Sequence, residues 1–214
     1  DQFQNLFGDG SQLGISITYI VQPKPEGLAQ ALLLGRDFLA GEPCCLILGD
    51  NLFYGASMPA LLQRCAKIKD GGIIFGYKVR DPERYGVVEF DAEQNVISIE
   101  EKPAEPRSSY AVTGLYFYDG HASDLAATLK PSSRGELEIT DLNNLYLQAG
   151  KLKVEFLGRG VAWLDTGTFE SMHQASSYVR AVQDRQGLRI AAIEEIAYRM
   201  GYITAEALRS LASS

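Results

Sequence analysis

The feature that most restricts the fold is a short apolar run that ends in glycine and aspartate. Residues 44–48 (CCLIL) are followed at once by Gly49, Asp50 and Asn51. A run of this kind is typical of a buried parallel strand, and open α/β sheets bind ligands at the carboxyl ends of such strands. The sequence therefore predicts a doubly wound sheet in which Asp50 faces a binding crevice.

Strand and helix patterns alternate along the first eighty residues. We expect strands over 15–21, 44–48 and 72–79, and helices over 27–39 and 57–67, the second with Ser57 as its N-cap. This βαβαβ order favours right-handed crossovers in one sheet.

The middle of the chain changes character. Strand-like residues 85–90 and 96–100 flank the turn 91–95, which predicts a β-hairpin. Further elements follow: a strand at 112–118, helices at 122–129, from Thr140 to Gly150 and from Thr168 to about 185, a strand at 152–157, and a terminal helix pair at 196–200 and 204–211. We expect residues 1–214 to form a single domain.

Charge and composition exclude several classes of protein. The formal net charge is −7, and no basic patch suited to nucleic acid or an anionic membrane surface is visible. No apolar run approaches the ~18 residues of a membrane helix, and the first residues lack a signal-peptide pattern. Cys44, Cys45 and Cys65 are expected to be reduced thiols, so we predict a cytoplasmic protein.

Two aspartates are candidates for metal binding. Asp50 follows a strand, and Asp165 lies in a glycine-containing loop before a helix. Such a pair could hold one Mg²⁺, which prefers two carboxylates with water and phosphate oxygens to a full protein cage. The alternative is that the two carboxylates cap a turn and a helix. No Ser-His-Asp order, CxxC or Walker loop is present.

Other charged segments are ambiguous when each is taken alone. Residues 100–103 (EEKP) and 134–138 (RGELE) could be solvated surface. Residues 22–30 connect a strand to a helix, where free N–H groups contact anions or carbonyl groups.

Seven ordered motifs together resemble the glucose-1-phosphate thymidylyltransferases, a branch of the sugar nucleotidyltransferases. They are residues 22–31 (QPKPEGLAQA), 48–55 (LGDNLFYG), 81–90 (DPERYGVVEF), 100–103, 110–118 (YAVTGLYFY), 134–141 (RGELEITD) and 163–168 (WLDTGT). The likeness runs through essentially the whole chain. It implies a Rossmann-like mixed sheet flanked by helices, with a small β-hairpin sugar-binding subregion and C-terminal helices.

The resemblance also implies roles. Thymidylyl would pass from dTTP to α-D-glucose 1-phosphate, with release of pyrophosphate and with Mg²⁺ as cofactor. The implied nucleotide site consists of Gln22, Gly27 and Asp50, and the implied metal ligands are Asp50 and Asp165. The implied catalytic groups are Lys102, Arg134 and Asp50. The implied sugar-phosphate site consists of Asn51, Tyr85, Gly86, Glu101, Lys102, Val112 and Trp163. It further implies dTDP-sugar ligands, a route to dTDP-deoxysugars such as dTDP-rhamnose, and a homotetramer.

The sequence departs from the family in one respect. The family's Gly-Gly-x-Gly-Thr-Arg loop, which cradles the triphosphate, is not among these 214 residues. We therefore expect an incomplete copy with little turnover, clipped also at its C-terminal end. The alternatives are a catalytically inactive sugar-nucleotide binder or regulatory partner, and a sister uridylyl- or cytidylyltransferase. A metal-dependent glycosyltransferase is a further alternative, but Gly49-Asp50-Asn51 is not the Asp-x-Asp motif that this class of enzyme uses.

Overall fold

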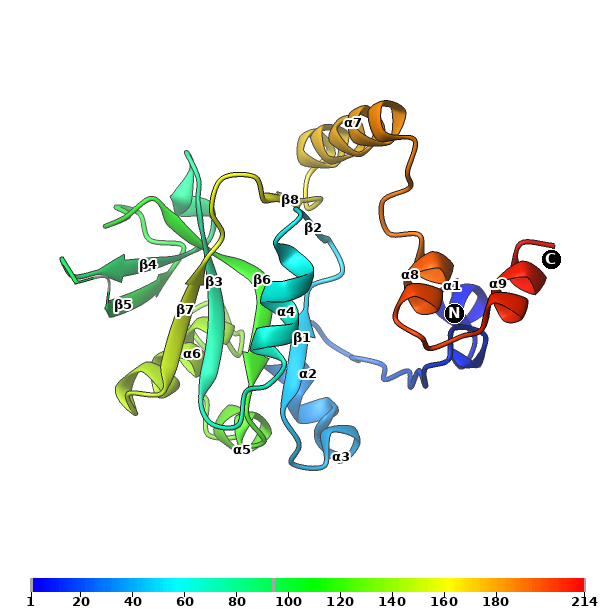
Figure 1. Ribbon diagram of the computed structural model, residues 1–214. Coiled ribbons are helices and arrows are strands. Elements are labelled where there is room, and N and C mark those ends of the chain that lie inside the picture. The colour runs from blue at the N-terminus through cyan, green and yellow to red at the C-terminus, as the bar shows by residue number, and fades with distance from the viewer. Residues whose placement is uncertain (1, 94, 214) are drawn as a thin grey trace. The chain divides into compact units, whose positions relative to one another are not determined.

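The computed structural model describes residues 2–93 and 95–213 (Figure 1). The chain divides into two compact units. The larger unit runs from Gln22 to His173, and the smaller unit combines the residues up to Val21 with those from Gln174 onward. Within the described residues, no helix has the length and apolar character needed to cross a bilayer.

Two sheets form the centre of the larger unit. The main sheet has the order β5-β4-β6-β3-β7, with β1 also paired to β6, and a second sheet joins β2 to β8. The strands are β1 (Cys44–Ile47), β2 (Asn51–Tyr54), β3 (Gly72–Lys78), β4 (Gly86–Phe90), β5 (Val96–Glu101), β6 (Tyr110–Tyr118), β7 (Leu152–Phe156) and β8 (Ala162–Asp165). The pairing of β3 with β7 is parallel, whereas β1, β4 and β3 run antiparallel to β6, so the predicted mixed sheet is confirmed.

The structure corrects the expected role of residues 44–48. Strand β1 is antiparallel to β6, with Cys44 opposite Tyr118 and Ile47 opposite Leu115. Cys45 is exposed, and Ile47 retains 56% of its accessible surface. The prediction of a buried parallel strand was therefore wrong for the pairing seen here, because an apolar run indicates burial without specifying the direction of its partner strand.

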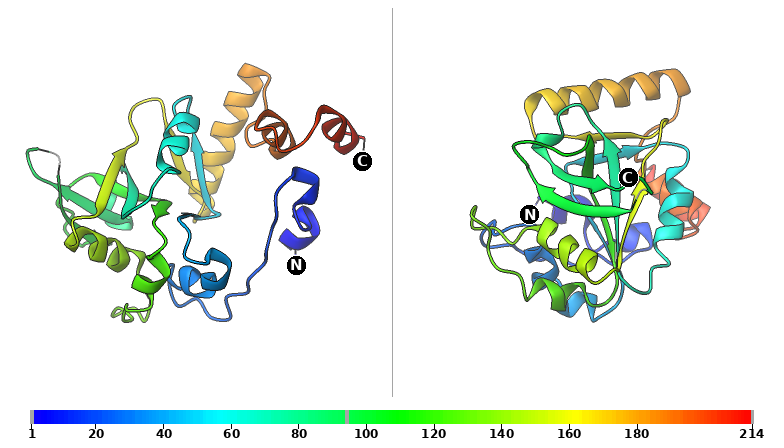
Figure 2. Two further views of the ribbon diagram at one scale, coloured as in Figure 1. Left: turned by 60° about the horizontal axis from the view of Figure 1, so that its bottom comes forward. Right: turned by 90° about the vertical axis from the view of Figure 1, so that its left-hand side faces the viewer.

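Helices cover the two faces of the main sheet separately, as Figures 1 and 2 show. On one face, α2 (Gln30–Leu34), α5 (Ala122–Ala126) and α6 (Ile139–Gln148) share a core with Ile74, Val88 and Tyr116 of the sheet. On the other face, α4 (Met58–Cys65) packs against Phe75 and Phe117. Burial of these apolar surfaces from both sides is what stabilises the sheet.

The predicted hairpin is formed by β4 and β5, with Val88 opposite Ile99. Within its expected turn, Gln94 lies outside the described residues. Elsewhere the helix boundaries differ from expectation. The expected helix 27–39 is split at Gly35 into α2 and α3 (Arg36–Leu39). Helix α6 has Glu138 as its N-cap residue, so Thr140 lies inside the helix.

A buried carboxylate joins three segments on the α5–α6 side of the sheet. Asp119 is 2% exposed and accepts hydrogen bonds from the Gly71 N–H (2.6 Å), the His121 N–H (2.9 Å) and the Tyr146 hydroxyl (2.7 Å). Burial alone would raise the pKa of Asp119, but these donors outweigh it and hold the pKa below its ordinary value. The ionised carboxylate therefore stabilises the folded state.

The smaller unit contains short helices: α1 (Gln2–Phe7), η1 (Ser11–Leu13), α8 (Ile193–Arg199) and α9 (Ala205–Leu211). The expected terminal helix pair is confirmed, and the Thr204 hydroxyl caps α9 by accepting from the Ala207 N–H. Helix α7 (Phe169–Gln186) spans the boundary between the units. Residues 15–21 form no strand, so that prediction was wrong; within the described chain they have no partner strand.

Candidate active site

One pocket of the larger unit contains most of the predicted functional residues. Its volume is about 380 Å³. Ten of the twelve predicted site residues line it: Asp50, Asn51, Tyr85, Gly86, Glu101, Lys102, Val112, Arg134, Trp163 and Asp165. They come from strands β2, β4, β5, β6 and β8, from residues next to these strands, and from the loop before α6. The pocket therefore depends on contacts between distant parts of the sequence.

The two aspartates are brought together by the β2–β8 sheet. Asn51 is the register partner of Asp165, and the Thr166 N–H donates to the Asp50 carbonyl oxygen at 2.8 Å. A Cβ built on Gly167 would lie 3.5 Å from Oδ2 of Asp165 and 3.9 Å from Oδ2 of Asp50. Both carboxylates therefore face the same small space, as the sequence predicts.

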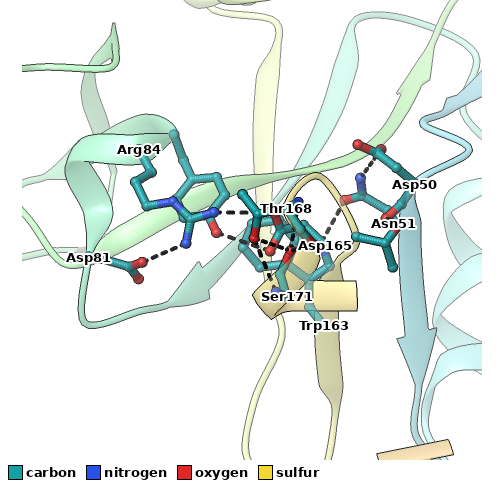
Figure 3. Close-up of polar contacts among 10 residues, drawn as sticks. Asp50, Asn51, Asp81, Arg84, Trp163, Asp165, Thr168 and Ser171 are labelled. Atoms are coloured by element: carbon teal, nitrogen blue, oxygen red, sulfur yellow. Dashed lines mark hydrogen bonds and ion pairs between the residues drawn. The ribbon is translucent and has the colours of Figure 1, made fainter. Parts of the chain in front are cut away.

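Asn51 holds this arrangement in place (Figure 3). Its Oδ1 accepts from Trp163 Nε1 at 2.6 Å and from the Gly114 N–H at 3.1 Å, and its Nδ2 donates to Asp50 Oδ1 at 2.8 Å. A Cβ on Gly114 would lie 2.6 Å from Oδ1 of Asn51, which is too close for any side chain. The interior glycine of β6 thus makes room for the side chain that orients Asp50.

Lys102 directly follows the last residue of β5 and lines the pocket. Its backbone has φ 45°, in the left-handed region, and its N–H donates to the Tyr85 carbonyl oxygen at 3.0 Å. A non-glycine residue rarely adopts this conformation, which is found where surrounding structure imposes it. No carboxylate of residues 2–93 and 95–213 forms an ion pair with the Lys102 ammonium, so it is available to an anionic ligand.

Glu101 and Tyr85 form the adjoining wall. The Thr140 hydroxyl donates to Glu101 Oε2 at 2.6 Å, and Gly86 leaves space for that contact, because a Cβ there would lie 3.3 Å from the same oxygen. The Tyr85 ring packs against Trp163 with centroids 5.1 Å apart. Burial and the Asp165 carboxylate raise the pKa of Tyr85 to about 12, so its hydroxyl stays protonated and can donate.

Arg134 lines the pocket with its charge already compensated. Its Nε lies 3.1 Å from Glu138 Oε1, and its Nη2 lies 2.6 Å from Glu136 Oε2 and 3.2 Å from Glu138 Oε2. The Arg134 guanidinium can therefore contact a phosphate group if the phosphate replaces the carboxylate of Glu136 or Glu138 as its partner.

Gln22 and Gly27 do not line the pocket. Gln22 Nε2 donates to Gln30 Oε1 at 2.5 Å. Gly27 has φ 105°, and a Cβ there would lie 2.3 Å from the carbonyl oxygen of Leu137, so this glycine permits close contact with the loop before α6. Leu28, which follows it, does line the pocket.

The charges of the pocket fit a divalent cation. Five carboxylates line it against three cationic side chains: Asp50, Glu101, Glu136, Glu138 and Asp165 face Arg84, Lys102 and Arg134. Oxygen donors are the ligands that Mg²⁺ prefers, with water and phosphate completing its shell. Within the described residues no cluster of three or more His, Cys, Asp or Glu could hold a metal. The residues that would hold such an ion are Asp50 and Asp165, whose Oδ2 atoms both lie near Gly167.

Sequence reasoning missed three residues of this site. Arg84 contacts Asp165, Thr140 positions Glu101, and Gly114 accommodates Asn51. A glycine inside a strand signals a close approach, so Gly114 could have been found. Arg84 belongs to the motif at residues 81–90, but only Tyr85 and Gly86 of that motif were expected to line the site.

Comparisons with known proteins show the family of the chain. The family model for nucleotidyl transferases matches residues 1–182. A glucose-1-phosphate thymidylyltransferase of Xanthomonas campestris pv. campestris (strain B100) is 60% identical over 211 residues, which is 99% of this chain and 72% of the relative. One from Neisseria gonorrhoeae is 57% identical over 94% of this chain and 70% of the relative.

Solved structures show the same relationship. A crystal structure of a Bacillus anthracis protein described by the same name, in complex with a sucrose, has 42% identity and a TM-score of 0.74, over 84% of this chain and 71% of that one. A UDP-glucose pyrophosphorylase complexed with UDP-glucose has 26% identity and a TM-score of 0.61, over 75% of this chain and 65% of that one. From its sequence and its fold alike, the chain belongs to the nucleotidyl transferase family and, within it, to the glucose-1-phosphate thymidylyltransferases.

Proposed function

We propose that this pocket serves the transfer of thymidylyl from dTTP to α-D-glucose 1-phosphate, giving dTDP-glucose and pyrophosphate. The observation that carries the proposal is the convergence of Asp50, Asp165 and Lys102 on one pocket, from segments far apart in the sequence. Two carboxylates for a cation and one unpaired ammonium are what two phosphate-bearing substrates require.

The residues divide the work by position. Lys102 holds the phosphate of the sugar phosphate, and Arg134 supports it after exchanging a glutamate partner. Glu101, fixed by Thr140, accepts from sugar hydroxyl groups next to the backbone at Gly86 and Val112. Trp163, held by Asn51, forms the apolar wall.

Asp50 and Asp165 would hold Mg²⁺, which when bound neutralises phosphate charge. The sugar-phosphate oxygen attacks the α-phosphorus of dTTP in line, a bond forms there, and the bond to the pyrophosphate oxygen breaks. No covalent protein nucleophile is needed, so catalysis consists of positioning and charge neutralisation. This accounts for a site rich in charged groups that has no nucleophile–base pair.

Nucleotide binding would involve Gln22 and Gly27, which lie beside the pocket wall at Leu28. Gly27 closely approaches Leu137 in the loop before α6, and the side-chain amide of Gln22 donates to the Gly27 carbonyl oxygen at 3.4 Å. These contacts hold in place the segment from which the Gln22 amide would reach the base. The ligands expected are dTTP, glucose 1-phosphate and dTDP-sugars, in a cytoplasmic homo-oligomer. A uridylyltransferase is the second candidate, because the similarity to UDP-glucose pyrophosphorylase extends over 75% of the chain.

Binding is the first test. The 214-residue chain is titrated calorimetrically with dTDP-glucose and with UDP-glucose in the presence of MgCl₂. We expect heat from dTDP-glucose, weaker binding of UDP-glucose, and loss of binding in Lys102→Ala. Equal affinity for both ligands would favour the uridylyl alternative, and no binding of either would contradict the proposed site.

Turnover is the second test. The isolated chain should release little pyrophosphate from dTTP and glucose 1-phosphate, because the family's Gly-rich loop is not among its residues. The same chain fused to the part of the Xanthomonas relative outside the 211 matched residues should release pyrophosphate. Binding without release by this fusion would show a sugar-nucleotide binder instead of an enzyme.

A further inference from the structure

Arg84 places a cation on one of the two aspartates. It ends the short helix η2 (Pro82–Arg84), and its Nη1 pairs with Asp81 Oδ2 at 2.8 Å while its Nη2 lies 3.4 Å from Asp165 Oδ2. Its guanidinium lies 5.2 Å from the centroid of the Tyr85 ring. Figure 3 shows Arg84 reaching from Asp81 to Asp165.

The two aspartates are therefore not equivalent. Both oxygens of Asp165 have a neighbour, since the Tyr85 hydroxyl lies 3.4 Å from Oδ1 and Arg84 lies 3.4 Å from Oδ2. Asp50 takes the neutral amide of Asn51, and no cation among the described side chains pairs with it.

The oxygen that Arg84 contacts is also the oxygen that faces Asp50. Oδ2 of Asp165 and Oδ2 of Asp50 are the atoms nearest to the space at Gly167. A divalent cation shared by the two carboxylates would thus need the oxygen that Arg84 occupies. Asp81 holds the other end of Arg84 at a shorter distance, so the guanidinium has a second carboxylate to stay with when it leaves Asp165.

We propose that Arg84 is a built-in competitor of the divalent cation at Asp165, which keeps cation affinity low until substrate phosphate supplies further ligands. This rests on the proposed function, because it takes Asp50 and Asp165 as cation ligands. Arg84 acts through Asp165 and is a positioning residue. An exposed ion pair of this length weakens a competing ligand by a factor of only about two to five.

The probe is Mn²⁺ alone, titrated into the substrate-free chain at low ionic strength and followed by the electron paramagnetic resonance signal of the free ion. We expect Arg84→Gln to bind Mn²⁺ about two to five times more tightly than the unsubstituted chain. Arg80→Gln is the matched control: it removes the same charge from an exposed arginine four residues earlier that forms no ion pair in the described structure. It should leave the affinity unchanged.

A second pair of variants separates the inference from the function on which it rests. In an Asp165→Asn background, Arg84→Gln should no longer change Mn²⁺ affinity, because the oxygen for which both compete has lost its charge. Equal affinities of Arg84→Gln and Arg80→Gln would overturn the proposal while leaving the metal site intact. Absence of Mn²⁺ binding in every variant would overturn both the competitor and the cation site, whereas dTDP-glucose binding would still be measured independently.

Discussion

Replacing Asn51 by alanine should loosen the wall of the pocket that contains Asp50 and Trp163. Asn51 Oδ1 accepts from two donors, and one of them is the Nε1 of Trp163, a residue that is only 8% exposed. Loss of the acceptor leaves that buried N–H unpaired, which costs about 1–3 kcal/mol, and the lost bond to the Gly114 N–H adds about 1 kcal/mol. We therefore expect the free energy of unfolding to fall by about 2–4 kcal/mol.

The assay uses the chain's single tryptophan, Trp163. Its fluorescence reports the site directly while urea unfolding reports stability. The Asn51→Ala variant should show a shifted emission maximum in the native state and a lower urea midpoint. Asn51→Asp should keep the Trp163 hydrogen bond and its emission, yet lose stability above pH 5, because it places a second carboxylate against Asp50.

Asn144→Ala is the matched control. Asn144 is a partly buried asparagine of α6 whose Nδ2 donates to the Ile99 carbonyl oxygen at 3.1 Å. It should lose about 1 kcal/mol without a change in emission. If Asn51→Ala had the urea midpoint and emission of the unsubstituted chain, Asn51 would not be the acceptor that holds Trp163, and the reasoning would be refuted.

Three further predictions concern single groups. Lys102→Ala should abolish calorimetric binding of glucose 1-phosphate. Lys102→Arg should restore little of it, because a broad planar guanidinium does not replace the compact ammonium that lines the pocket; full rescue by arginine would contradict this. The ultraviolet titration of Tyr85, taken as the difference between the unsubstituted chain and Tyr85→Phe, should have its midpoint near pH 12. Because an unfolded tyrosine ionises near pH 10, the stability that Tyr85 contributes is present below pH 10 and is lost as the pH rises toward 12. A midpoint near pH 10 would be the contrary result. Asp119→Asn should lower the free energy of unfolding at pH 7 by about 1–3 kcal/mol. Because the pKa of Asp119 is depressed in the folded state, the difference in stability from the unsubstituted chain should shrink as the pH falls below about 4. A difference that is independent of pH would show that the charge of Asp119 does not contribute.

The sequence predicted those parts of the site whose signals are local. The hairpin β4–β5 follows from alternating residues around a polar turn. The local sequence leaves residues 100–103 ambiguous, and the role expected of Lys102 comes from the family resemblance. Asp50 and Asp165 were expected to form a pair because Asp50 follows a strand and Asp165 lies in a glycine-containing loop before a helix. The sequence allowed the two carboxylates to be placed near each other, but it did not reveal that strands β2 and β8 pair to bring them together.

The rest depends on long-range pairing. Strands β2 and β8 have four residues each, which is too short for a clear alternation of apolar and polar residues. Their pairing also joins positions more than a hundred residues apart, which no local pattern predicts. Thr140 had the pattern of a helix cap, yet its hydroxyl is used by Glu101, a partner that the local sequence does not reveal. Residues 15–21 have strand-like composition without a partner strand in the described chain, which shows that β-propensity needs a neighbour.

The small β2–β8 sheet also has a kinetic consequence. The hydrogen bond from Thr166 to the Asp50 carbonyl oxygen closes a loop of 116 residues, and the bond from Trp163 to Asn51 closes one of 112. Closing such loops costs entropy before the contacts repay it, so pairings of this length form late. The Asp50 and Asp165 carboxylates should therefore meet after the main sheet has assembled. If they bind a cation as proposed, the capture of Mn²⁺ during refolding would time this last step of folding.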